Sequence, residues 1–219
     1  IGESHLLDLG SRDGIADAKM EIIHGLNDDG LLVYFGDEPL LTERVKELNG
    51  NIQVQSFGRS DQNDIFPIEV EQNDTGSSFN VNLAKERFFL PVLGTHNIMN
   101  ALSAMLVARH FAIPFEKMNE GLSTLKLTQM RMELVEGAKG EKIINDAYNA
   151  SPTSMNAAIE LISNLPGYEK KILVLGDMLE LGPLEEEFHN QIGESLNPKS
   201  IDLVFTLGNL GKLISIGAT

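Results

Sequence analysis

The segment Ile143-Ile144-Asn145-Asp146-Ala147-Tyr148-Asn149-Ala150-Ser151-Pro152 predicts the end of a β-strand and the start of a helix. Ser151 is a favoured N-cap residue, Pro152 suits the first helical position, and apolar residues follow at helical spacing. In an α/β sheet, ligands bind in the crevice beyond the carboxyl ends of the strands. The residues that we expect to contact a nucleotide or a substrate here are Asp146, Tyr148 and Asn149.

Strands and helices alternate around this turn. Beyond residue 130 we expect strands at 132–136 and 142–145, a helix at 155–164, a strand at 171–175, a helix at 185–196, a strand at 202–207 and a helix from 210 onward. This alternation predicts a mostly parallel, doubly wound α/β sheet. The polar segment 123–130 is the expected domain boundary, which divides the chain into domains 1–128 and 129–219.

The first domain is expected to combine helices with an antiparallel β layer. Residues 1–5 resemble the tail of a strand. The other elements expected are a strand at 31–35 and helices at 11–26, 39–48, 95–111 and 115–122. Between residues 51 and 91, short alternating segments separated by Gly, Asn and Asp predict antiparallel strands. These strands are expected at 52–57, 64–70, 77–83 and 87–90.

The composition limits the classes of partner. The 219 residues are 42% hydrophobic, which is enough for one large core or two modest ones. A net charge of -15 argues against nucleic acid or an anionic membrane. The chain has no cysteine, which excludes disulfides and thiolate metal sites, and no apolar run approaches the roughly 20 residues of a membrane span. It begins at Ile1 rather than methionine, so we expect a piece of a longer protein.

Two asparagines open the longest predicted helix. In Gly94-Thr95-His96-Asn97-Ile98-Met99-Asn100-Ala101, Asn97 and Asn100 are three residues apart and share a helical face. Two carboxamides on a face of small residues can bond the edge of a flat heterocycle. Alternatively, both side chains cap and solvate the first helical turn.

Two basic residues near the start of the chain are candidates for chemistry. His5 follows the expected strand end, and Lys19 lies one residue from the apolar stripe of a helix. Partial burial favours the neutral, nucleophilic form of a lysine amine. The plainer alternative is a structural histidine and a solvated lysine.

A carboxylate loop follows the strand expected at 171–175. Asp177 and Glu180 in Leu175-Gly176-Asp177-Met178-Leu179-Glu180-Leu181-Gly182 could bind an ammonium group, or could only solvate the loop. Several common motifs are absent. The segment 208–213 lacks the spacing of a phosphate loop, 61–64 lacks the features of a calcium loop, and no G-x-G-x-x-G follows a predicted strand. The missing glycine fingerprint argues against a Rossmann dehydrogenase.

Taken in order, the motifs resemble the Mur ligase family. They are His5-Leu6, Ala18-Lys19-Met20-Glu21-Ile22, the Gly94–Ala101 segment, Arg131, Asp146–Pro152 and Leu175–Gly182. The resemblance runs from Ile1 to about Gly211, and the last of these motifs favours the member that handles a D-alanyl dipeptide. It implies part of the family's central ATPase domain, with a mixed sheet, followed by an incomplete Rossmann-like C-terminal domain.

The resemblance also implies a reaction. Such an enzyme uses ATP and Mg²⁺ to activate a carboxylate of UDP-N-acetylmuramoyl-tripeptide as an acyl phosphate, which D-alanyl-D-alanine attacks, in peptidoglycan synthesis. We expect a cytoplasmic monomer without membrane insertion. No phosphate loop, no glutamate for a first magnesium ion and no UDP-binding domain lie within this chain, so we expect the isolated chain to be inactive.

Residue roles follow from the same resemblance. His5 matches a histidine at the second magnesium ion, and Lys19 matches a lysine that several members carry as a carbamate near that metal. The remaining matches are Asn97 and Asn100 at adenine, Arg131 at the ATP phosphates and Asp146 at the ribose. The alternatives are another amide ligase of this type, such as a folylpolyglutamate synthetase, or a non-catalytic nucleotide-binding module.

Overall fold

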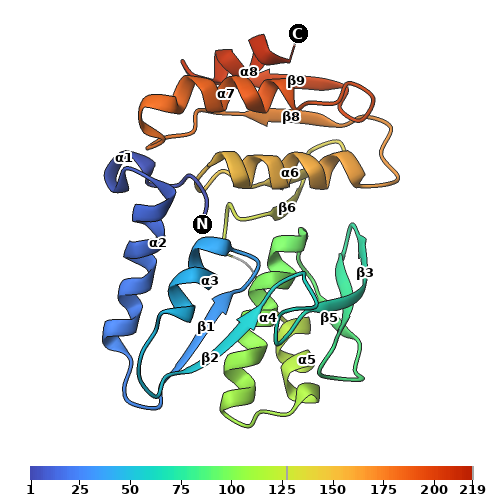
Figure 1. The fold of residues 1–219 in the computed structure, drawn as a ribbon. Helices are drawn as coiled ribbons and strands as arrows, with labels where there is room; N and C mark the ends of the chain where they lie inside the picture. Colours follow the sequence, from blue (N-terminus) through green and yellow to red (C-terminus); the bar gives the residue numbers. More distant parts are fainter. Residues whose placement is uncertain (127, 219) are drawn as a thin grey trace. The chain divides into compact units, whose positions relative to one another are not determined.

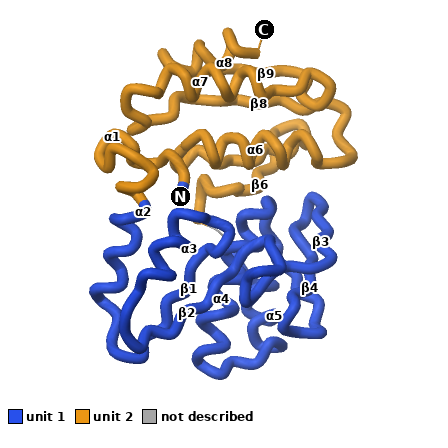
Figure 2. The backbone as a smooth tube through the Cα atoms, viewed as in Figure 1, with its two compact units in different colours: residues 1, 16–127 blue, residues 2–15, 128–219 orange. Residues whose placement is uncertain are grey.

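The computed structural model describes residues 1–126 and 128–218, which form two compact units (Figure 1). Unit 1 comprises residue 1 and residues 16–127, and unit 2 comprises residues 2–15 and 128–219 (Figure 2). Residues 2–15 thus belong to unit 2. The predicted division into domains 1–128 and 129–219 remains a prediction. Residue 127 of the predicted boundary and residue 219 of the predicted last helix lie outside the described residues.

Unit 1 contains a parallel strand pair. β1 (Leu31–Phe35) and β2 (Gln53–Phe57) are in register from Leu31↔Gln53 to Phe35↔Phe57, and α3 (Pro39–Lys46) connects them. The prediction that 52–57 belongs to an antiparallel layer is wrong. Alternating polarity indicates a strand but not the direction of its partner, and the helical crossover returns the chain in the parallel direction.

The antiparallel layer consists of three strands, β3 (Pro67–Asn73), β4 (Gly76–Val81) and β5 (Phe88–Leu90). β4 pairs with both neighbours, and α4 (Thr95–His110) and α5 (Phe115–Ser123) complete the hydrophobic core of the unit. Phe79 stacks on Phe88 at 5.8 Å between ring centroids, and Leu102 and Leu106 of α4 are fully buried. The apolar face of α4 thus fixes the helix whose first turn carries the two asparagines.

The start of the chain is helical and not a strand. α1 (Leu6–Leu9) follows residues 1–5, which form no strand, and α2 (Arg12–Met20) continues into the 3₁₀ helix η1 (Glu21–Gly25). The prediction of a strand tail at 1–5 is therefore wrong. Ile22 lies in this 3₁₀ segment and is 66% exposed, because the change to three residues per turn shifts the face that a side chain occupies.

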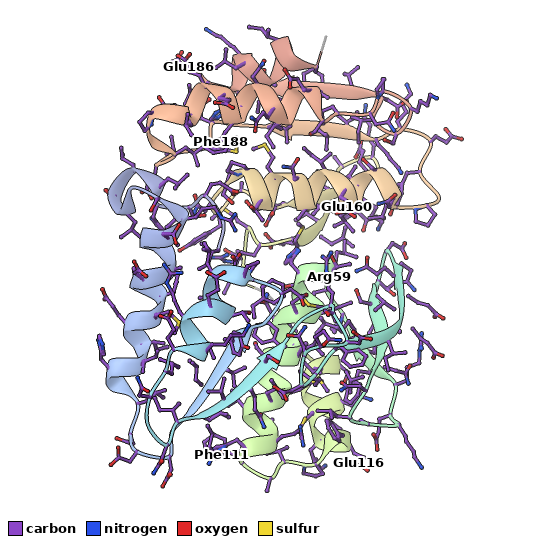
Figure 3. All side chains as sticks on the ribbon, viewed as in Figure 1. Arg59, Phe111, Glu116, Glu160, Glu186 and Phe188 are labelled. Atoms are coloured by element: carbon purple, nitrogen blue, oxygen red, sulfur yellow. The ribbon has the colours of Figure 1, made fainter. Side chains whose placement is uncertain are left out.

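Unit 2 contains an antiparallel hairpin, β6 (Glu133–Glu136) and β7 (Lys142–Asn145), and a parallel pair, β8 (Ile172–Leu175) and β9 (Leu203–Thr206). The helices are α6 (Pro152–Asn164), η2 (Gly182–Leu184), α7 (Glu185–Glu194) and α8 (Gly211–Gly217). Its core includes Met155, Ile159, Met178, Ile192 and Ile214, and Phe188, labelled in Figure 3, packs against it.

The predicted N-cap of α6 is confirmed. The Ser151 hydroxyl accepts a hydrogen bond from the Ser154 N–H, and the Ser154 hydroxyl accepts one from the Ser151 N–H. Pro152 occupies the first turn. This reciprocal cap fixes where the helix begins, and therefore which residues remain in the loop after β7.

Candidate functional site

Asn97 and Asn100 lie on one face of the first turns of α4, as predicted. The Asn97 side chain is buried, and its Nδ2 donates to the Leu93 carbonyl at 2.7 Å. Asn100 is exposed, and its Nδ2 donates to the Asn97 Oδ1 at 3.4 Å. The two residues thus differ. The Asn97 side chain is engaged in a hydrogen bond at the start of α4, whereas the Asn100 carboxamide is accessible to a ligand.

The surroundings of this helix start include Arg59, which is labelled in Figure 3. Its guanidinium donates to the Thr95 hydroxyl at 3.0 Å, and its own N–H donates to the Asp37 carboxylate. Asp37 also accepts from the Asn63 side chain at 2.7 Å. This network links the loops after β1 and β2 to the first residue of α4.

Lys19 lies in the last turn of α2, and its side chain is exposed. This exposure favours the plainer alternative, a solvated lysine, over partial burial. Lys19 is three and four residues after the buried Ala16 and Ile15, but its long side chain carries the amine past their stripe into solvent. The carbamate at Lys19 remains a prediction from the resemblance.

Arg131 occupies a strained turn before β6. Met130 and Met132, on either side of it, have φ of +59° and +49°, in the left-handed region that bulky side chains rarely adopt. Two hydrogen bonds hold this turn. Tyr148 N–H donates to the Met130 carbonyl at 3.1 Å, and Met132 N–H donates to the Asp146 Oδ1 at 3.0 Å. Residues at strained positions often serve function.

The turn after β7 faces this arginine. The Arg131 Cζ lies 4.1 Å from the centroid of the Tyr148 ring, a cation–π geometry. Asp146 is half-buried, while Tyr148 and Asn149 are exposed. The structure therefore brings Arg131, which precedes β6, together with Asp146 and Tyr148, which follow β7. The Asn149 Oδ1 accepts from the Ala150 N–H at 2.9 Å, which supports the turn itself.

A second cluster joins the start of the chain to the loop after β8. The His5 Nδ1 lies 2.7 Å from the Glu180 Oε2, and both side chains are about half exposed. Asp8 lies nearby, so that ligand atoms of His5, Asp8 and Glu180 all fall within 4.8 Å of one another. The prediction that Glu180 binds a substrate ammonium is untested, but its carboxylate here pairs with an imidazole.

Asp177 supports the loop between β9 and α8. Its two carboxylate oxygens accept hydrogen bonds from the Gly211 N–H at 2.6 Å and the Asn209 N–H at 3.2 Å. Gly208, at φ +101°, brings the backbone so close that a Cβ would overlap the Asp177 carboxylate. These contacts favour the structural alternative for Asp177, while its role as a substrate residue remains a prediction.

The sequence analysis did not identify one residue that supports the loop after β8. His189 of α7 is fully buried, its Nε2 accepts a hydrogen bond from the Met178 N–H at 2.8 Å, and its Nδ1 lies 2.6 Å from the Glu185 carbonyl. A histidine within an amphipathic helix gives no local signal of such a bond. Only the packing of α7 against the loop reveals it.

Two family models match nearly all of the chain. The Mur ligase middle domain matches residues 1–108, and the Mur ligase glutamate ligase domain matches residues 130–215. The chain belongs to the Mur ligase family. It is 52% identical over 218 residues to the UDP-N-acetylmuramoyl-tripeptide–D-alanyl-D-alanine ligase of Bacillus subtilis, covering 100% of this chain and 47% of that relative. This chain of the Mur ligase family thus spans about half the length of the relatives it matches.

Solved structures agree with the Mur ligase assignment. MurF from Acinetobacter baumannii matches with a TM-score of 0.87 and 28% identity, over 99% of this chain and 47% of that one. MurF from Thermotoga maritima in complex with ADP matches with a TM-score of 0.84 and 27% identity, over 98% of this chain and 49% of that one. Folylpolyglutamate synthase of Mycobacterium tuberculosis matches with a TM-score of 0.64 and 19% identity, over 96% of this chain and 53% of that one. This likeness shows the fold alone. Within residues 1–126 and 128–218, no helix is long and apolar enough to cross a membrane.

Proposed function

We propose that the complete protein carrying this chain is an ATP-dependent ligase that adds D-alanyl-D-alanine to UDP-N-acetylmuramoyl-tripeptide. The observation that carries this proposal is the 52% identity, over the whole chain, to the Bacillus subtilis ligase with that name. The tripeptide carboxylate would become an acyl phosphate, and the dipeptide amine would attack it with loss of phosphate. The expected result is a new amide bond in a cell-wall precursor.

The chain's own residues would bind and orient the nucleotide. Asn100 presents an exposed carboxamide that can bond the adenine edge, and Asp146 offers its second carboxylate oxygen to the ribose hydroxyls. Arg131 carries a permanent cation on a turn that is fixed on both sides, which suits it to hold a phosphate in one orientation. The ADP complex of the Thermotoga maritima relative supports a nucleotide site in this fold.

Mg²⁺ is part of the proposal. The cluster of His5, Asp8 and Glu180 fits a divalent cation in its chemistry, because imidazole and carboxylate ligand atoms lie within 4.8 Å of one another. His5 and Asp8 would hold the cation, and the Glu180 carboxylate contacts the His5 Nδ1. A bound metal ion would supply charge neutralisation at the phosphates. For unit 1, we propose that Lys19 carries a carbamate. Native mass spectrometry at mild pH would detect the added mass, and an unmodified Lys19 under these conditions would rule the carbamate out.

The alternatives receive less support. Folylpolyglutamate synthases share the fold at under 20% identity, whereas the 52% relative is a ligase of the D-alanyl dipeptide. No described contact favours a non-catalytic module over an enzyme. We also propose a cytoplasmic monomer that binds small substrates. The net charge of -15 argues against nucleic acid as a partner.

Phosphate release by the complete protein tests the function. The assay contains ATP, D-alanyl-D-alanine and UDP-N-acetylmuramoyl-tripeptide, with each omitted in turn. We expect release only when all three are present. Release that needs a folate and glutamate instead would replace the substrates, and no release with either pair would favour the non-catalytic module. The isolated 219-residue chain serves as a control that we expect to be inactive.

A further inference from the structure

The contact between His5 and Glu180 joins residues 175 positions apart in the sequence. The distance of 2.7 Å between the His5 Nδ1 and the Glu180 Oε2 is that of a strong hydrogen bond. Both residues belong to unit 2, and a backbone bond from the Leu7 N–H to the Glu180 carbonyl, at 3.0 Å, ties the same segments together. The pair is therefore held by the backbone as well as by the side chains.

The direction of this hydrogen bond selects one form of the imidazole. An ionised carboxylate can only accept, so a neutral His5 must carry its proton on Nδ1. Its Nε2 then keeps a lone pair, which is the group that binds a metal ion. Carboxylates that contact the second nitrogen of a metal-binding histidine act in this way in metal sites generally.

We propose that Glu180 is a positioning residue that orients His5, fixing the Nδ1–H tautomer and presenting Nε2 to a divalent cation. This inference rests on the proposed function for the identity of the cation, and assigns to Glu180 a role other than binding the substrate ammonium. The residues that hold Glu180 in place belong to the loop after β8, and we do not assign them as ligands of the cation.

The loop is anchored at two points before it reaches Glu180. The buried His189 accepts a hydrogen bond from the Met178 N–H, and Asp177 accepts from the Asn209 N–H before α8 and from the N–H of Gly211, the first residue of α8. Met178 and Leu181, on either side of the exposed part, are fully buried in the core of unit 2. The base of the loop is thus rigid, and the Glu180 side chain extends from it to His5.

Backbone conformation supports a functional reason for this arrangement. His5 has φ +66° and Glu180 has φ +63°, so both partners occupy the left-handed region, which costs free energy for residues with a Cβ. Glycine would adopt this conformation without strain. Two side chains at strained positions are thus directed at one another, an arrangement that is frequent at functional sites.

Nuclear magnetic resonance of the complete protein, labelled with ¹⁵N in histidine, tests the proposal. Long-range ¹H–¹⁵N spectra at about pH 8.5, where an ordinary histidine is neutral, report the tautomer of each imidazole. A His5→Gln variant assigns the signal. We expect the Nδ1–H form for His5, a change toward the Nε2–H form in Glu180→Ala, and retention of Nδ1–H in Glu180→Gln, whose side-chain oxygen still accepts.

Asp8→Ala is the matched control, because it removes an equal charge from the same cluster without removing the bond to Nδ1. We expect it to leave the His5 tautomer unchanged. An Nε2–H tautomer in the wild-type protein, or an unaltered tautomer in Glu180→Ala, would overturn the proposal. A tautomer that changes in Asp8→Ala as it does in Glu180→Ala would overturn it too, since charge and not the hydrogen bond would then be responsible.

Titration with Mn²⁺ alone separates this inference from the proposed function. Paramagnetic broadening of the His5 signal would locate the cation, and we expect Glu180→Ala to weaken its binding by about 10-fold or more. If the tautomer responds as expected but Mn²⁺ does not broaden His5, the orientation by Glu180 is supported and the metal role of His5 is wrong. Equal Mn²⁺ affinity in wild type and Glu180→Ala would contradict the presentation of Nε2.

Discussion

The Arg131 guanidinium stacks over the Tyr148 ring, with its Cζ 4.1 Å from the ring centroid. Both side chains are exposed, and backbone hydrogen bonds to Met130 and Met132 fix the turn that carries Arg131. The aromatic face restricts the arginine without using its N–H donors, which stay available for phosphate oxygens. This relationship gives Tyr148 a role that its position after a strand does not reveal.

Replacing Tyr148 by leucine removes the aromatic face under the arginine. At an exposed site a cation–π contact contributes about 0.5–1 kcal/mol, so we expect turnover of the complete enzyme to fall by about 2- to 5-fold. Tyr148→Phe keeps the face and serves as the control, with turnover unchanged. Steady-state kinetics with saturating ATP measure the effect. A loss in Tyr148→Phe equal to that in Tyr148→Leu would assign the role to the hydroxyl instead.

Arg131→Ala removes the cation itself. The charge on the transferring phosphoryl group is redistributed in the transition state, so we expect turnover to fall by about 100-fold while the Kd of ATP changes much less. Pre-steady-state rates and equilibrium binding of a non-hydrolysable ATP analogue separate the two quantities. A turnover equal to that of the wild type would remove Arg131 from the phosphate site.

Asn97 and Asn100 should respond oppositely to the same substitution. Asn97→Ala removes the bond to the buried Leu93 carbonyl and should reduce the free energy of unfolding by about 1–3 kcal/mol. Asn100→Ala changes an exposed residue, so stability should stay within about 0.5 kcal/mol while ATP binding weakens. Urea denaturation and ATP titration measure the two effects. Unchanged ATP affinity in Asn100→Ala would assign that residue to helix capping.

His189→Ala leaves the buried Met178 N–H without its acceptor and opens a cavity beneath the loop. We expect a loss of about 3 kcal/mol in the free energy of unfolding. His24→Ala, at an exposed position of η1, is the control and should cost less than about 0.5 kcal/mol. Thermal and urea unfolding measure both. Equal stabilities of the two variants would contradict the anchoring role of His189.

Glu141 supplies a prediction about pH. Hydrogen bonds from the Lys139 N–H, at 2.9 Å, and from the Glu141 N–H lower the pKa of the exposed Glu141 carboxyl. Because the folded-state pKa lies below the unfolded one, the carboxylate stabilises the turn of the β6–β7 hairpin above the unfolded-state pKa, and this contribution is lost as pH falls through the folded-state pKa. A ¹³C titration of Glu141 should show a lowered pKa, and Glu141→Gln should remove this part of the pH dependence. A Glu141 pKa equal to that of an ordinary glutamate would contradict this prediction.

Local signals predicted much of the fold. The Ser151 cap, the strands at 31–35 and 142–145 and the long helix of Asn97 and Asn100 follow from capping chemistry and hydrophobic periodicity, and all are confirmed. The pairing direction of residues 52–57 was predicted wrongly, because the partner of a strand is decided by the connection and not by its own polarity pattern. The helical start of the chain was missed because it depends on packing against distant residues.

The candidate site was predictable only in part, for the same reason. Asp146 and Tyr148 were found because they follow a strand in the sequence, and their contacts with the segment around Arg131 are local to one hairpin. The bond between His5 and Glu180 and the anchor at His189 connect distant segments. No spacing rule in the sequence predicts such contacts, since they arise only when the loop after β8 packs into its core.

Mass analysis of the reaction product identifies the substrates that the complete protein joins. The complete protein is incubated with ATP, UDP-N-acetylmuramoyl-tripeptide, a folate, D-alanyl-D-alanine and glutamate in one mixture. We expect a single new product, the tripeptide precursor extended by the D-alanyl dipeptide through an amide bond. A folate extended by glutamate, with the tripeptide unchanged, would contradict it.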